Sequence, residues 1–166
     1  MASNQKNLSD FSGSTSIPSA KSIRFGIVVS EWNAEITQAL YGGALKTLFA
    51  NGAVVKNIKT IKVPGSFELT LGAQLLARRK DIDAVICLGC VIQGETKHFE
   101  FICQAVATGI TDLNIKFNKP VIFGVLTTNN MQQAQDRCGG KHGNKGDEAA
   151  VTAIKMASLN KIKIKA

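Results

Sequence analysis

Apolar runs alternate along the chain with segments in which apolar residues recur every three or four positions. Four runs predict β-strands: RFGIVVS at 24–30, VKNIKTIKV at 55–63, DAVICLGCVI at 83–92 and PVIFGVLTT at 120–128. Helical spacing predicts helices from the cap residue Asn33 to Gly52, from the cap residue Ser66 to about Lys80, from His98 past Ile110, over 130–138 and over 147–159. The segment GGKHGNKG at 139–146 is predicted to be a loop.

This alternation with short connections is typical of a parallel sheet that helices cover on both faces. The first and third strands are wholly apolar and belong in the centre, whereas the half-polar second strand belongs at an edge. The pattern therefore predicts an α/β fold of the flavodoxin-like type, a three-layer α/β/α sandwich whose four-stranded parallel sheet has the order 2-1-3-4. We expect one domain over residues 23–166 and a flexible N-terminal arm over residues 1–22.

Ligands in such folds bind outside the carboxyl ends of the strands, near the switch point between strands one and three. His98 follows the third strand and falls in the first turn of a helix, where the dipole favours a neutral imidazole that can transfer protons. Backbone N–H groups near Glu95 and Thr96 suit a phosphate at the same helix start. The simpler alternative is a surface histidine beside a helix cap.

Aromatic and basic residues near this edge are also candidates. Trp32, the only tryptophan, offers a flat face for stacking an aromatic ring, or is half-buried for structural reasons. Phe67 and Phe123 are core residues by default. Arg137 suits a phosphate, although the adjacent GGKHGNKG lacks the spacing of a nucleotide-binding P-loop.

The cysteines do not indicate a metal site or a disulfide. Cys87 and Cys90 form C-x-x-C inside a predicted strand, where their side chains point to opposite faces and lie about 10 Å apart along it. The H-x-E at His98 also resembles zinc deaminases, but no P-C-x-x-C follows it. Because the four thiols accompany no secretion signal, we expect a reducing, cytoplasmic compartment.

The net charge of +8 favours anionic partners. A small phosphorylated substrate fits this charge, whereas a nucleic-acid partner is not expected because no aromatic residues interleave with the lysines. No membrane partner is expected either, since no apolar run reaches the roughly 18 residues of a membrane span. The serine-rich start is interpreted as a polar arm rather than an organelle transit segment.

Five ordered segments resemble the 6,7-dimethyl-8-ribityllumazine synthases: VVSEWNAEIT, VPGSFEL, LGCVIQGETKHFE, PVIFGVLTT and DRCGGKHGNKGDEAA. The resemblance covers nearly the whole chain after residue 22. It implies the penultimate enzyme of riboflavin biosynthesis, a transferase that condenses 5-amino-6-(D-ribitylamino)uracil with 3,4-dihydroxy-2-butanone 4-phosphate. Phosphate and water are released, and neither a cofactor nor a metal is implied.

The resemblance also implies residue roles. Trp32 stands where the family stacks an aromatic on the pyrimidine, and Asn33 is assigned to the same binding set. The segment that holds the ribityl chain corresponds to Ser66, Phe67 and Glu68. The segment along the pyrimidine edge corresponds to Cys90, Val91 and Ile92.

The phosphate-bearing substrate has its own implied set, which comprises Glu95, Thr96 and Arg137, and His98 corresponds to the proton-transfer residue. Family sites lie between protomers of a pentamer, so a neighbouring subunit is expected to supply Phe123, Arg137 and Lys145. His98 and Arg137 are the residues to which catalysis is assigned. We expect His98 to be helpful rather than indispensable and Arg137 to matter more for binding the phosphate.

Three positions depart from the commoner family pattern. Cys90 stands where threonine is frequent, Gln93 where arginine is frequent, and Trp32 where phenylalanine is usual. A non-catalytic flavin or pterin carrier on the same fold is the alternative function, because Trp32 could serve it as a stacking platform. A related riboflavin synthase, which dismutates two lumazines, is disfavoured by the match of all five segments.

The resemblance bears on assembly as well. The uninterrupted GGKHGNKG turn resembles that of members whose twelve pentamers close into a hollow sixty-subunit shell, and association with riboflavin synthase is a further implied partnership. The N-terminal arm, with Ile17 and Ile23 around Pro18, is expected to add a strand to a neighbour's sheet in such a shell.

Overall fold

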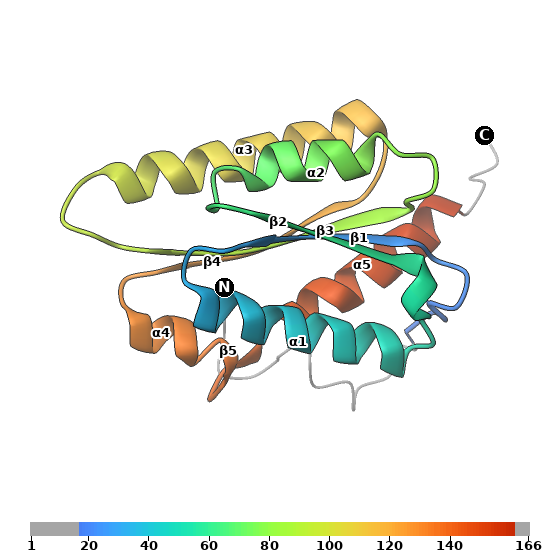
Figure 1. Ribbon diagram of the computed structural model, residues 1–166, viewed down its shortest axis with the longest axis horizontal. Helices are drawn as coiled ribbons and strands as arrows, with labels where there is room; N and C mark the ends of the chain where they lie inside the picture. The colour runs from blue at the N-terminus through green and yellow to red at the C-terminus, as the bar shows by residue number, and fades with distance from the viewer. Residues whose placement is uncertain (1–16, 162–166) are drawn as a thin grey trace.

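The four apolar runs form one parallel sheet at the centre of the molecule (Figure 1). The computed structural model describes residues 17–161, so most of the predicted N-terminal arm, residues 1–16, lies outside the described part of the chain. The strands are β1 (Phe25–Ser30), β2 (Ile58–Val63), β3 (Ala84–Ile92) and β4 (Val121–Thr128). Their order is β2-β1-β3-β4 and all pairs are parallel, which confirms the predicted topology.

Helices cover both faces of this sheet, as Figure 1 shows. One face carries α2 (Leu69–Ala77) and α3 (His98–Phe117), and the other carries α1 (Ala34–Ala50), α4 (Met131–Gln135) and α5 (Lys145–Lys161). A 3-10 turn, η1 (Val55–Asn57), occupies the predicted beginning of the second strand. None of the described helices is long and apolar enough to cross a membrane.

The central strands β1 and β3 divide the core into two apolar layers. All six residues of β1 and the first seven of β3 are buried. Cys87 packs in the layer beneath α2 and α3, and Cys90 in the layer facing α1 and α5, as expected for residues three apart on a strand. Both thiols are free.

The segment before β1 lies against the core. Ala20 is fully buried and its N–H donates to the carbonyl of Asn51, while Ile23 is also buried and Ile17 packs beside them. These contacts attach residues 17–23 to the end of α1.

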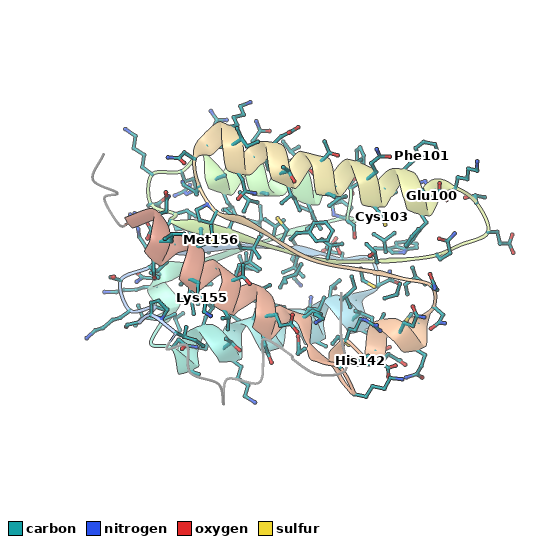
Figure 2. The ribbon with its side chains drawn as sticks, turned by 180° about the vertical axis from the view of Figure 1, so that it is seen from behind. Glu100, Phe101, Cys103, His142, Lys155 and Met156 are labelled. Atoms are coloured by element: carbon teal, nitrogen blue, oxygen red, sulfur yellow. The ribbon has the colours of Figure 1, made fainter. Side chains whose placement is uncertain are left out.

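The segment 139–146 is more ordered than the predicted loop. Strands β5 (Cys138–Gly140) and β6 (Gly143–Asn144) form a small antiparallel hairpin, and α5 begins directly after it at Lys145. Positive φ angles of 130° at Gly139 and 72° at Gly143 make the turn accessible mainly to glycine. Figure 2 shows His142 of this hairpin at the opposite side of the molecule from α3.

The Asn144 side chain ties this hairpin to two helices. Its amide nitrogen donates to the carbonyls of Ala39 in α1 at 2.9 Å and of Cys138 at 3.2 Å, and its oxygen accepts the N–H of Gly146. Helices α1 and α5 cross closely there, because a Cβ at Gly146 would overlap the Leu40 carbonyl. The crossing therefore depends on glycine as much as on apolar packing.

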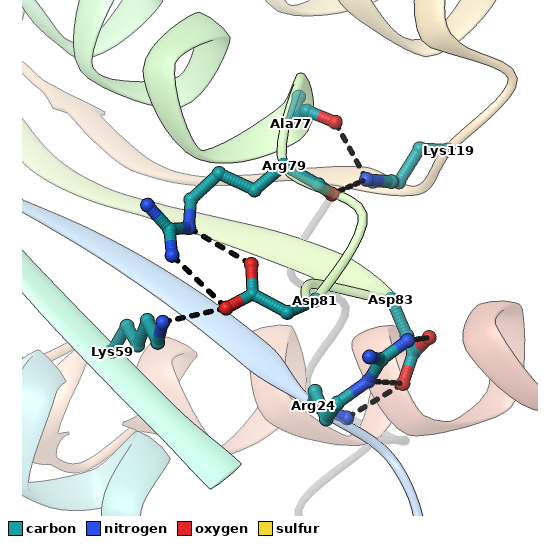
Figure 3. Close-up of polar contacts among 7 residues, drawn as sticks. All are labelled: Arg24, Lys59, Ala77, Arg79, Asp81, Asp83 and Lys119. Carbon is teal, nitrogen blue, oxygen red and sulfur yellow. Dashed lines mark hydrogen bonds and ion pairs between the residues drawn. The ribbon is translucent and has the colours of Figure 1, made fainter.

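Polar groups close the opposite, amino-terminal edge of the sheet (Figure 3). Arg24 pairs with Asp83 at 2.8 Å. Asp81 accepts hydrogen bonds from Arg79 and Lys59, and these hydrogen bonds hold the pKa of Asp81 well below its usual range. Lys119 donates to the carbonyls of Ala77 and Arg79 just after α2, a favourable place for a cation. These contacts hold the amino-terminal end of the sheet, and none of the predicted site residues lines the cavity of about 320 Å³ beside it.

Two adjacent glycines of α1 test the close helix crossing. A Cβ at Gly43 would lie 2.5 Å from both Asn144 Nδ2 and Asp147 Oδ1, whereas a Cβ at Gly42 would meet nothing within 4 Å. We expect Gly43→Ala to destabilise the fold by about 1–3 kcal/mol through overpacking. The matched Gly42→Ala should stabilise it by about 0.5–1 kcal/mol, since alanine favours a helix. Urea unfolding at equal protein concentration measures both, and equal effects would contradict the close crossing.

Candidate active site

A cavity of about 610 Å³ opens at the carboxyl edge of the sheet. The loops after β1, β2 and β3 and the start of α3 surround it, so it occupies the predicted ligand-binding edge. We call it the first cavity; its lining comprises Trp32, Asn33, Pro64, Gly65, Ser66, Phe67, Glu68, Cys90, Val91, Ile92, His98 and Ile102.

Two aromatic side chains stand open to solvent at this cavity. Trp32 is 72% exposed and Phe67 is 55% exposed, so neither the half-buried reading of Trp32 nor the core reading of Phe67 holds within one chain. The loops that carry them are joined, because the Trp32 N–H donates to the Pro64 carbonyl at 3.0 Å. The turn before α2 is closed by Glu68, whose Oε2 accepts the N–H of Gly65 at 3.0 Å.

The two predicted helix caps have other partners. Asn33 precedes α1, but it adopts left-handed backbone angles and its side chain does not cap the helix; instead its Nδ2 donates to the Cys90 carbonyl at 3.1 Å. Ser66 does not cap α2, which begins only at Leu69, and its buried hydroxyl lies 3.4 Å from the same Cys90 carbonyl. Both side chains therefore connect loops around the cavity.

His98 is the first residue of α3, exposed at the cavity. Its backbone N–H donates to Thr96 Oγ1 at 3.4 Å, which uses one of the free backbone donors at the helix start. Glu95 and Thr96 lie on the exposed loop before it and are not in the lining of the first cavity. Ile102, one helical turn further along α3, adds an apolar wall that the sequence motifs did not single out.

A second cavity of about 530 Å³ runs along β4, an edge strand of the sheet, and is lined on one side by α5. Phe123, Arg137 and Lys145 lie together here, and Phe123 is 42% exposed rather than in the core. Arg137 Nη1 donates to the Gln133 carbonyl at 3.0 Å. Lys145 Nζ pairs with Glu148 Oε1 at 2.6 Å, so its charge is partly balanced, whereas Arg137 forms no ion pair among the described residues.

An ion pair and a hydrogen bond at Asp136 stabilise the hairpin beside Arg137. Asp136 accepts from Gln132 at 3.1 Å and pairs with Lys141 at 3.1 Å, and these hydrogen bonds lower the pKa of the Asp136 carboxyl. The N–H of Lys145 donates to the Arg137 carbonyl at 2.9 Å, which links the two cations of the second cavity through the backbone. Neither Asn144 nor Glu148 was singled out in the sequence. The Asn144 side chain bonds to Ala39, which is distant along the chain, whereas Glu148 pairs with Lys145 within one helical turn.

Most of the predicted site residues thus divide between two cavities of one chain that share no lining residue, whereas Glu95 and Thr96 line neither cavity. The first cavity has aromatic faces, a buried hydroxyl, a carboxylate and an imidazole, but no lysine or arginine in its lining. The cations belong to the second cavity. Within residues 17–161, no group of three or more histidine, cysteine or acidic residues could hold a metal ion.

Comparison with known proteins gives a consistent result. The model of the family described as 6,7-dimethyl-8-ribityllumazine synthase matches residues 22–161. A protein of that name from Cytophaga hutchinsonii is 65% identical over 156 residues, which cover 94% of this chain and 97% of the relative. Proteins of the same name from Flavobacterium johnsoniae and Bacteroides fragilis are each 57% identical, covering 96% and 84% of this chain and 83% and 100% of theirs.

The cysteine at the cavity wall provides a test of this geometry. Burial raises the pKa of both Cys87 and Cys90 to about 12, so neither forms appreciable thiolate at pH 8 in the folded protein. We expect iodoacetamide at pH 8 to leave both unmodified, while the partly exposed Cys103 and Cys138 react. Mass spectrometry of the peptides, with urea-unfolded protein as the control in which all four react, measures this. Alkylation of Cys90 as fast as Cys138 would show that its thiol faces the cavity.

Proposed function

The chain belongs to the 6,7-dimethyl-8-ribityllumazine synthase family and is an enzyme of riboflavin biosynthesis, and from this premise we propose that its active site forms where the first cavity of one protomer meets the second cavity of a neighbour. The family reaction joins 5-amino-6-(D-ribitylamino)uracil to 3,4-dihydroxy-2-butanone 4-phosphate with loss of phosphate and water. The alternative of a non-catalytic carrier is not favoured by this membership.

The single observation that carries the proposal is that the first cavity, which has Trp32 and Phe67, contains no lysine or arginine, whereas the second cavity does. One substrate is a flat uracil with a polyol chain and the other is a phosphate ester. The first cavity suits the uracil, yet no lysine or arginine lines it to balance a phosphate. The second cavity, on the β4 edge of the same chain, contains Arg137 and Lys145. A site made by two copies supplies both kinds of group.

In this proposal the pyrimidine stacks on the Trp32 indole, which is exposed enough to receive it. The ribityl hydroxyls lie along the turn before α2, where polar groups can pair with them; that turn contains Ser66, Phe67 and Glu68. The pyrimidine edge follows the end of β3, where backbone groups are available at Cys90, Val91 and Ile92.

The phosphate of the second substrate is bound by the neighbour's Arg137, whose planar guanidinium can donate two parallel hydrogen bonds to it. Lys145 of the same cavity contributes less, since Glu148 already shares its charge. Phe123 closes the cavity beside the substrates. Glu95 and Thr96, at the start of α3 in the first protomer, approach the phosphate from the other side, where the helix dipole favours an anion.

His98 moves the protons of the reaction. An amine must add to a ketone, and water and phosphate must then leave, so protons have to be taken from nitrogen and given to departing oxygens. An exposed imidazole at the mouth of the first cavity can do both. Much of the remaining acceleration comes from holding two small reactants in contact, which replaces an encounter in solution.

A head-to-tail contact between these two cavities forms a ring when its rotation closes. We propose a pentamer, and twelve pentamers in a shell of sixty subunits, with riboflavin synthase as an associated partner and the cytoplasm as the compartment of the four free thiols. Exposed apolar side chains support an interface on the α2–α3 face: Leu71, Leu75, Phe101 and Ile115. Figure 2 shows Phe101 on the outer side of α3.

Substitution of the two proposed catalytic residues should separate chemistry from binding. We expect His98→Ala to lower kcat by no more than the about 10²–10⁴-fold that one proton-transfer group supplies, with little change in KM. Arg137→Ala should raise KM for the butanone phosphate, and Lys145→Ala should raise it less. Lumazine absorbance gives the rates. A His98→Ala enzyme that binds both substrates but is wholly inactive would contradict the importance of positioning.

Mixed oligomers test the shared site directly. A Trp32→Ala/His98→Ala variant impairs only the first cavity, and an Arg137→Ala variant impairs only the second. Refolded together in equal amounts, they should regain activity, because about a quarter of the interfaces in a random ring then combine two intact halves. The same variants refolded separately and then combined are the control. If co-refolded oligomers stay as inactive as the control, each site lies within one protomer.

A further inference from the structure

The carbonyl of Cys90 joins two loops to strand β3 at the first cavity. Strand β1 pairs with β3 only as far as Val29 and Leu88, whereas β3 continues to Ile92. Beyond the paired region, the Cys90 carbonyl accepts a hydrogen bond from Asn33 Nδ2 at 3.1 Å and one from the Ser66 hydroxyl at 3.4 Å. Beyond the end of the β1–β3 pairing, side chains from the loops after β1 and β2 therefore supply the hydrogen bonds to β3.

The backbone of Asn33 is shaped for this contact. Its φ of 58° and ψ of 49° are left-handed, a conformation that asparagine tolerates better than most residues. Its carbonyl accepts the N–H groups of Ile36 and Thr37, so it begins α1 through its backbone while its side chain is directed to β3. The amide is half-buried at the cavity wall and is already engaged by the protein.

Trp32 directly precedes Asn33, so the position of its backbone is linked to that of Asn33. The Trp32 N–H is bonded to the Pro64 carbonyl, which fixes the backbone to the loop after β2. The indole itself is 72% exposed, so few packing contacts hold it within the chain. The backbone from which the indole extends is therefore held at two points, by the bond of the Trp32 N–H to the Pro64 carbonyl and by the Asn33–Cys90 contact that follows it.

We propose that Asn33 is a positioning residue whose side chain, bonded to the Cys90 carbonyl, holds the Trp32 indole in place for the pyrimidine substrate. This rests on the proposed function, in which Trp32 stacks on that substrate. In this role the Asn33 amide bonds to the protein and does not contact the substrate directly. The role also restricts the effect of Asn33 to the uracil half of the reaction, since the phosphate partner lies toward the other cavity.

Three substitutions distinguish the effect of the Asn33 side-chain amide from the effect of its backbone conformation. Asn33→Gly retains the left-handed conformation and removes the hydrogen bond. Asn33→Asp keeps the shape and an acceptor oxygen, but ionised it cannot donate to the Cys90 carbonyl and repels it. Asn118 provides the matched control: it is the other described non-glycine residue with positive φ, at 44°, and it ends α3 far from the cavity lining. Asn118→Gly makes the same chemical change there.

The sole tryptophan makes the position of the ring measurable without substrate. We expect Asn33→Gly to lower the fluorescence anisotropy of Trp32 and to raise KM for the pyrimidine about fivefold, the factor of one hydrogen bond, with KM for the butanone phosphate unchanged. Asn33→Asp should lose at least as much, and Asn118→Gly should change neither quantity. Unchanged anisotropy in Asn33→Gly would overturn the proposal, and so would a wild-type pyrimidine KM in Asn33→Asp, which would indicate a direct acceptor.

The proposed function fails by a different result. If Trp32→Ala leaves the pyrimidine KM unaltered, Trp32 does not stack on that substrate, whatever the anisotropy shows. A fall in anisotropy in Asn33→Gly together with a raised pyrimidine KM in both Asn33→Gly and Trp32→Ala supports the positioning role.

Discussion

Burial of β1 and β3 on both faces is the constraint from which the architecture follows. Their apolar side chains point to both sides, so each side of the sheet needs a layer of helices. Parallel strands with helical crossovers then bring every strand's carboxyl end to one edge. Most residues that line the first cavity belong to short loop segments at that edge, and the buried strands hold these loops in place.

The strands do not end together, and this unevenness shapes the site. Because β3 extends beyond its pairing with β1, it presents backbone groups that neighbouring loops can use. Asn33 and Ser66 both converge on one of them. At the wall of the first cavity, side chains from two loops thus continue the hydrogen bonding of the sheet.

The sequence patterns were sufficient for the sheet and much of the site's location. Continuous apolar runs identified β1 and β3, and the C-x-x-C spacing placed Cys87 and Cys90 on opposite faces, as the two core layers confirm. What local patterns could not reveal were contacts across the chain. Asn33 is of a residue type and at a position typical of a helix cap, but its side-chain amide bonds to Cys90, 57 residues away along the chain. The hairpin at 138–144 likewise depends on Asn144 bridging to α1.

The two edges of the sheet differ in how they resist unwanted pairing with other chains. Strand β2 exposes lysines, Lys59 and Lys62, which discourage another strand from adding to it. Strand β4 instead has the exposed Phe123 and the second cavity along its length. In the proposed assembly, the neighbour that completes the site also covers this edge strand, which in a single copy is free to pair with other chains. The surface along β4 would then serve two purposes in this assembly, because its burial both completes the active site and prevents aggregation through the edge strand.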